Sequence, residues 1–147
     1  IVLVRQSIRW TATLEDWRGV EMAQKRNFSI ETPRGTLNSV TGKNGKVTVK
    51  LEWKSRFGKE KSAGFSKAQA FVDSECLRLM NPLAPRRTGF LIKSGTLGTV
   101  VGSGSVEYLA PYARRQYYEH KTRKKWFETM KKGHLNSIRK GAAKFIG

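Results

Sequence analysis

The sequence predicts an α+β fold, in which a small antiparallel β-sheet packs with one central helix and one C-terminal helix, after a β-rich N-terminal extension. Apolar and polar residues alternate strictly over residues 46–53, which is the period of a strand. Apolar residues recur at three- and four-residue spacing over 66–80 and again over 123–145, which is the period of a helix. We therefore divide the chain into an extension, residues 1–45, and an α+β domain, residues 46–147.

The extension is predicted to be β-rich or irregular. From Ile8 to Leu14, every second residue is apolar, as in a half-buried strand. Two later stretches, residues 32–35 (TPRG) and 42–45 (GKNG), have the composition of turns or linkers. The first strand of the domain follows, with Val47, Val49, Leu51 and Trp53 on one face.

The central helix is predicted to begin at Ser66, a good N-cap residue, after a polar stretch over residues 56–64. Its apolar face comprises Phe71, Val72, Cys76, Leu79 and Met80. Residues 81–85 (NPLAP) end it, because proline cannot continue the backbone hydrogen-bond ladder.

Short apolar alternations over residues 89–110 predict an antiparallel hairpin that turns at residues 102–105 (GSGS). Within it, Thr88 and Gly89 are expected to form a tight turn that leads Phe90 into a strand. A short helical stretch should follow up to Tyr118, and then a closing helix over residues 123–145. The closing helix has an apolar stripe of Phe127, Met130, His134, Ile138, Ala142 and Phe145.

Charge is the most unusual feature of the chain. Its 29 lysines and arginines outnumber 11 acidic residues, for a net charge of +18. Residues 121–147 hold nine basic side chains against Glu128 alone. Such an excess predicts a negative neighbour, namely nucleic acid, an acidic protein surface or anionic lipid. The candidate residues for contact with DNA or an acidic partner are Lys124, Lys131, Lys132, Arg139 and Lys140.

We find no pattern typical of an enzyme, and we expect no catalytic residue, metal or cofactor. His120 and His134 have no nucleophile or carboxylate at a catalytic spacing, and Cys76 falls on an apolar helix face. Gly102-Ser103-Gly104 lacks the Lys-Ser/Thr of a phosphate-binding loop, so a hairpin turn is the favoured interpretation. The longest apolar run has four residues, so we expect a soluble protein with no membrane partner.

Three segments, taken in order, resemble one protein family. They are residues 81–95 (NPLAPRRTGFLIKSG), 108–119 (YLAPYARRQYYE) and 124–127 (KKWF), and a closing helix follows them. Their order resembles that in minor capsid or head–tail joining (tail completion, neck) proteins of long-tailed bacteriophages. The resemblance covers residues 46–147, and the extension has no counterpart in it. It implies a virion structural protein at the neck, assembled in the host cytoplasm.

The resemblance also implies partners. We expect a homo-oligomeric ring of six or twelve copies that contacts other neck and tail proteins and surrounds non-specifically bound DNA. Tyrosine and arginine supply contact area at low entropic cost, which suits an interface between protomers. The candidate interface residues are Tyr108, Tyr112, Arg114, Arg115, Tyr117 and Tyr118.

A second interpretation remains open. Small size, basic composition and interspersed aromatic residues are also typical of a nucleic-acid-binding module of the ribosomal-protein type. Binding of the free monomer to DNA or RNA with a steep dependence on salt would favour this alternative.

Overall fold

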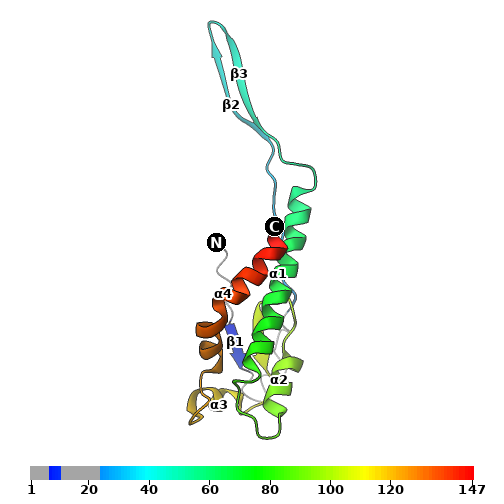
Figure 1. Ribbon diagram of the computed structural model, residues 1–147. Coiled ribbons are helices and arrows are strands. Elements are labelled where there is room, and N and C mark those ends of the chain that lie inside the picture. The colour runs from blue at the N-terminus through cyan, green and yellow to red at the C-terminus, as the bar shows by residue number, and fades with distance from the viewer. Residues whose placement is uncertain (1–6, 11–23) are drawn as a thin grey trace.

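The computed structural model describes residues 7–10 and 24–147 and has the predicted α+β fold. Figure 1 shows a helical body from which a long β-hairpin projects at one end. The hairpin consists of β2 (Gly35–Gly42) and β3 (Gly45–Leu51). The body contains β1 (Ser7–Trp10), α1 (Phe57–Met80), α2 (Phe90–Gly98), β4 (Ser105–Tyr108), α3 (Ala113–Glu119) and α4 (Trp126–Ile146).

The strand predicted at residues 46–53 corresponds to β3 of this hairpin. Its antiparallel pairing runs from Gly35 opposite Leu51 to Gly42 opposite Gly45, with one irregularity at Leu37. β2 thus lies in the predicted extension, and β3 begins at its last residue, Gly45. The hairpin lies apart from the helices, and the strands that lie among the helices are the parallel pair β1–β4 (Figure 1).

Helix α1 begins at Phe57, nine residues before the predicted start at Ser66. Residues 56–64 are polar, but the end of α4 packs against them and stabilises their helical conformation. The Lys61 ammonium donates to the carbonyl oxygen of Ile146 at 2.6 Å. Gly64 lies so close to the Phe145 carbonyl that a Cβ there would come within 2.6 Å of its oxygen. The end of α1 at Met80, just before Asn81 and Pro82, agrees with the prediction.

The hairpin predicted over residues 89–110 is wrong. Residues 90–98 form α2, and β4 pairs in parallel with β1, with Ser105 beside Ser7 and Tyr108 beside Trp10. The buried residues of α2, Leu91, Ser94 and Gly95, have helical spacing, which the short apolar alternation concealed. Of the strand predicted from Ile8 to Leu14, residues 11–14 lie outside the described residues.

Helix α4 confirms the predicted closing helix, and it packs along α1 (Figure 1). Phe127, Met130 and Ile138 are buried as predicted. His134 is exposed, and Phe145 is half exposed with its ring 5.4 Å from that of Phe71, so these parts of the predicted stripe need correction. The ring of Phe71 also lies on Gly141, where a Cβ would come within 2.5 Å of it.

Gly89 has the backbone conformation that the turn was expected to require, with φ +81° directly before α2. No atom of the described residues lies within 4 Å of the position that a Cβ would take, so a substitution meets no steric contact with them. We expect Gly89→Val to lower the free energy of unfolding by about 1–2 kcal/mol, because the left-handed region penalises a β-branched residue. Urea denaturation monitored by circular dichroism measures this loss. Gly89→Asn should cost less, and equal loss in both variants would contradict the backbone explanation.

Candidate functional site

Two residues of the predicted interface, Tyr108 and Tyr117, meet Trp126 in the core, and we define these three residues as the buried aromatic cluster. The Trp126 ring centroid lies 4.8 Å from that of Tyr117 and 5.7 Å from that of Tyr108. The Trp126 indole Nε1 donates a hydrogen bond of 3.1 Å to the Tyr108 hydroxyl. Burial raises the pKa of Tyr108 to about 12, and it does the same for Tyr117 with a further contribution from Glu128.

This cluster corrects part of the interface prediction. Tyr108 and Tyr117 are buried within the protomer itself, so their side chains are not available to a second protomer. The exposed members of the predicted set are Tyr112, Arg114, Arg115 and Tyr118, on α3 and the residue before it. Tyr118 is 52% exposed and Tyr112 is 42% exposed. The Arg115 guanidinium donates to Glu119 at 2.9 Å on the same surface.

The predicted basic residues of the C-terminal region are all exposed, and we call this set the α4 basic face. All five lie in solvent, namely Lys124, Lys131, Lys132, Arg139 and Lys140. The two ion pairs found among the described residues, Glu75–Arg78 and Arg115–Glu119, both lie elsewhere. The α4 basic face is therefore available to an external anion.

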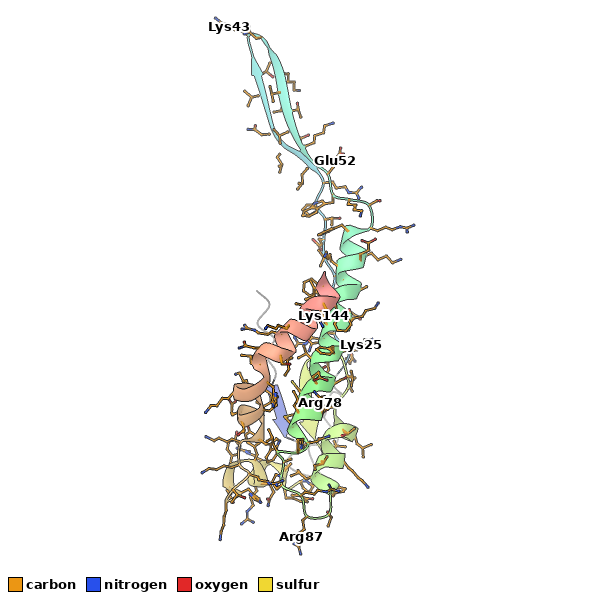
Figure 2. All side chains as sticks on the ribbon, viewed as in Figure 1. Lys25, Lys43, Glu52, Arg78, Arg87 and Lys144 are labelled. Atoms are coloured by element: carbon orange, nitrogen blue, oxygen red, sulfur yellow. The ribbon has the colours of Figure 1, made fainter. Side chains whose placement is uncertain are left out.

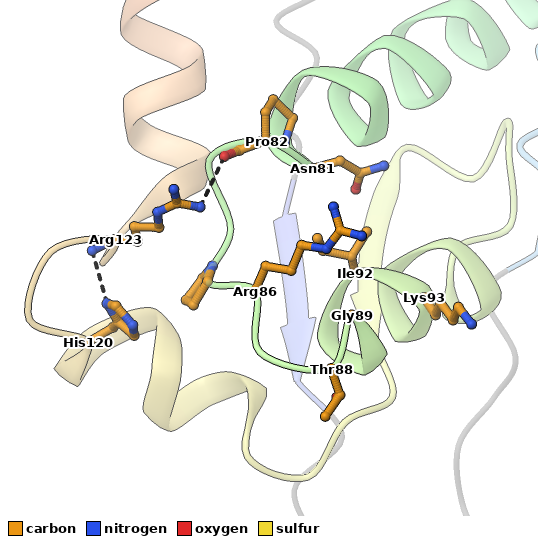
Figure 3. A pocket seen from close by; sticks show the side chains of 10 residues that line it. Asn81, Pro82, Arg86, Thr88, Gly89, Ile92, Lys93, His120 and Arg123 are labelled. Carbon is orange, nitrogen blue, oxygen red and sulfur yellow. Dashed lines mark hydrogen bonds between the residues drawn. The ribbon is translucent and has the colours of Figure 1, made fainter.

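An open pocket of about 940 Å³ lies between the end of α1, the start of α2 and the loop before α4 (Figure 3). Its wall, as far as the described residues form it, contains the cations Arg86, Lys93 and Arg123 and no carboxylate. The Arg123 guanidinium is held by the carbonyl oxygens of Pro82 and Ala84, at 3.4 and 3.2 Å. The charge and hydrogen-bond donors of this pocket suit an oxyanion such as a carboxylate or a phosphate.

His120 closes one side of the pocket (Figure 3). Its Nδ1 accepts hydrogen bonds from the backbone N–H groups of Thr122 and Arg123, at 3.3 and 3.0 Å. His120 organises the loop before α4 through these bonds.

Asp73 is a structural residue that sequence reasoning missed. Its carboxylate is fully buried, and Oδ2 accepts the backbone N–H groups of Gly102 and Gly104 at 2.7 and 3.0 Å. Its Oδ1 accepts from the Gln69 amide at 2.7 Å. The Gly-Ser-Gly segment is thus neither a hairpin turn nor a phosphate loop, because its N–H groups bind the chain's own carboxylate. The signal available in the sequence was an acidic residue on an otherwise apolar helix face.

Cys76 is buried beside this site, as its helical position predicted. Burial raises the pKa of its thiol to about 12, and the carboxylates of Asp73 and Glu75 add to the effect. The described residues include no group of three or more histidine, cysteine or acidic side chains arranged to hold a metal ion. Within the same residues, no helix is long and apolar enough to span a membrane.

No protein-family model matches the sequence, and no curated protein or solved structure is significantly similar to the chain.

Proposed function

We propose that this chain is a non-enzymatic structural protein of a phage neck, which forms a homo-oligomeric ring joining the DNA-filled head to the tail. One observation supports the proposal most: the three segments that carry the resemblance pack together as a single unit. Gly95 of the first segment lies against the Tyr108 ring of the second, where a Cβ would come within 2.7 Å. Trp126 of the third segment then contacts both Tyr108 and Tyr117. The residues of the three segments thus build one core.

The exposed residues of the same unit have the chemistry of a protein interface. Tyr112 and Tyr118 offer large rigid rings, and Arg114 and Arg115 lie between them in the sequence. Tyrosine and arginine dominate binding energy at protein interfaces. We assign the contact with a neighbouring protomer, or with another neck or tail protein, to these four residues.

The α4 basic face supports the second part of the proposal, a ring around DNA. Lysines that point into water attract phosphate groups without reading bases, so DNA can slide past them. We therefore assign Lys131 and Lys132 to the wall of the channel.

Electron microscopy tests the proposal directly. The purified full-length protein is imaged alone, and virions of the phage that carries this chain are labelled with a gold-conjugated antibody against it. We expect ring-shaped particles in the first sample and label at the head–tail junction in the second. Label confined to the capsid shell or the tail tip, or absent from virions, would overturn the proposal.

The nucleic-acid-binding module remains the second candidate, because the α4 basic face is exposed and no carboxylate of the described residues pairs with it. For either function, we expect Lys131→Glu/Lys132→Glu to keep the fold and to weaken binding to a duplex of random sequence. Fluorescence anisotropy at several salt concentrations should show a lower slope of log affinity against log salt, by about one unit for each phosphate group that the variant no longer neutralises. An unchanged slope would show that the two lysines do not bind phosphate.

Thr129→Glu is a suitable control for that measurement, because Thr129 is an exposed residue of the same helix outside the lysine pair. It adds negative charge without removing a lysine, so it should change the affinity less than the double reversal does. The two candidates are then separated by assembly. A ring that forms without nucleic acid favours the neck protein, and a monomer that binds nucleic acid tightly favours the binding module.

A further inference from the structure

The β2–β3 hairpin has an apolar face that the described part of the chain does not cover. The pairing places Val40 opposite Val47 and Asn38 opposite Val49, and directly opposite residues lie on the same face of a sheet. The three valines, which we call the valine face, are 60%, 69% and 50% exposed. The opposite face is polar, with the Ser39 and Thr48 hydroxyls 3.3 Å apart and Lys46 opposite Thr41.

The described residues of the body do not supply the missing cover. The hairpin extends beyond the start of α1, and Lys43 at its tip is far from the helices (Figure 2). Every residue from 33 to 50 is exposed. A two-stranded hairpin is at best marginally stable in water, and both of its edges are open to pairing. An amphipathic ribbon of this kind is stabilised when a second molecule covers its apolar face.

We propose that the hairpin is an assembly arm, which docks its valine face on the body of a second copy of this chain. We assign the receiving surface to an exposed apolar segment at the end of α2 and just after it, which consists of Leu97, Val100 and Val101. α2 lies at the end of the body away from the hairpin, so an arm does not reach the receiving surface of its own protomer (Figure 1). The inference deepens the proposed function and rests on its homo-oligomeric part.

The size of the arm favours a repeated contact over an isolated dimer. A stable interface takes about 800 Å² from each partner. β3 has seven residues, so the ribbon is about 23 Å long, and its strands lie about 4.8 Å apart. One such face is too small to hold two chains together alone. In a head-to-tail arrangement each copy gives one arm and receives another, so closure into a ring doubles the interface area of every protomer.

The exposed valines favour a second copy over nucleic acid as the occupant of the arm, and the effect of salt distinguishes the two. The hairpin carries Lys43, Lys46 and Lys50, but a phosphate backbone would leave the valine face uncovered. Two copies of a chain with charge +18 repel each other at low salt, and salt screens that repulsion. Association through valines should therefore strengthen as salt rises. Binding to nucleic acid should weaken over the same range.

The test uses sedimentation velocity of the full chain at low and high salt, about 50 and 500 mM, over a range of protein concentrations. We expect the wild type to form larger species, more so at the higher salt. Val40→Thr/Val47→Thr/Val49→Thr keeps β-branched side chains and removes the apolar face, so it should raise the concentration needed for assembly by roughly tenfold or more. Lys46→Glu/Lys50→Glu changes the other face and should leave assembly intact. Circular dichroism checks that both variants keep their helices.

A mixing experiment tests the head-to-tail geometry. Leu97→Ser should also impair assembly when it is studied alone. When it is mixed with the triple valine variant, one intact arm meets one intact receiving surface, so we expect at most a weak dimer that dissociates on dilution, and nothing larger. Rings that persist in the triple valine variant would overturn the arm while leaving the proposed ring standing. A wild type that assembles only on DNA, and fails to do so in Lys46→Glu/Lys50→Glu, would instead show a nucleic-acid arm.

Discussion

Replacing Trp126 by alanine is expected to lower the free energy of unfolding by about 3–5 kcal/mol, the range for the loss of a large buried aromatic side chain. The Trp126 side chain is 1% exposed and lies at the centre of the buried aromatic cluster. Its removal leaves a cavity between Tyr108 and Tyr117. It also leaves the Tyr108 hydroxyl without the indole donor. Urea denaturation followed by far-ultraviolet circular dichroism is the measurement.

Trp126→Phe is the matched control. It keeps an aromatic ring in the cluster but removes the Nε1 donor, so the expected loss is smaller, about 1–2 kcal/mol. Tyr108→Phe removes the other partner of the same hydrogen bond. The double variant should then cost less than the sum of the two single variants, because both remove one interaction. Strict additivity would show that the hydrogen bond contributes nothing to stability.

Asp73→Ala is expected to destabilise the protein by about 3 kcal/mol or more. Hydrogen bonds to a charged group are worth about 1.5–3 kcal/mol each, and the Asp73 carboxylate accepts three of them from described residues, namely Gln69, Gly102 and Gly104. Its loss leaves the N–H groups of Gly102 and Gly104 buried without this acceptor. The loop before β4 should then open, and hydrogen exchange at those two amides reports this separately from global unfolding.

Asp73→Asn separates hydrogen bonding from charge. The asparagine carbonyl can still accept the two glycine N–H groups, while its amide donates to the Gln69 carbonyl oxygen after that side chain turns over. We therefore expect the loss in Asp73→Asn to be less than half of that in Asp73→Ala. Equal losses would mean that the negative charge, rather than the geometry of the acceptors, holds the loop.

The elements that could be predicted from the sequence are those whose pattern is long and local. The closing helix is close to the predicted bounds, because its apolar spacing continues along its whole length. β3 is recognisable from seven alternating residues. α2 is not, because nine residues with four apolar side chains fit a strand as well as a helix. In the folded protein α2 packs with Gly95 against the Tyr108 ring, a contact that the local pattern of residues 90–98 does not record.

The candidate site could be predicted only in part, for a related reason. The exposed state of the α4 basic face follows from helical spacing, because the lysines fall outside the apolar stripe. The assignment of Tyr108 and Tyr117 to an interface rests on composition alone. Composition does not distinguish a tyrosine that packs on another protomer from one that packs on Trp126.

What the sequence determined by itself is set by local backbone chemistry and by charge. The end of α1 before Pro82 and the positive φ of Gly89 depend on residues close together in the chain. The excess of basic residues is a property of the composition alone. Only the tertiary structure decided that β1 pairs in parallel with β4, that Asp73 binds the loop after α2, and that no described segment covers the valine face. The first two features join residues far apart in the chain, and the third depends on which segments lie nearby. The first two features are stabilised by burial and by hydrogen bonds between distant segments, which no local pattern records.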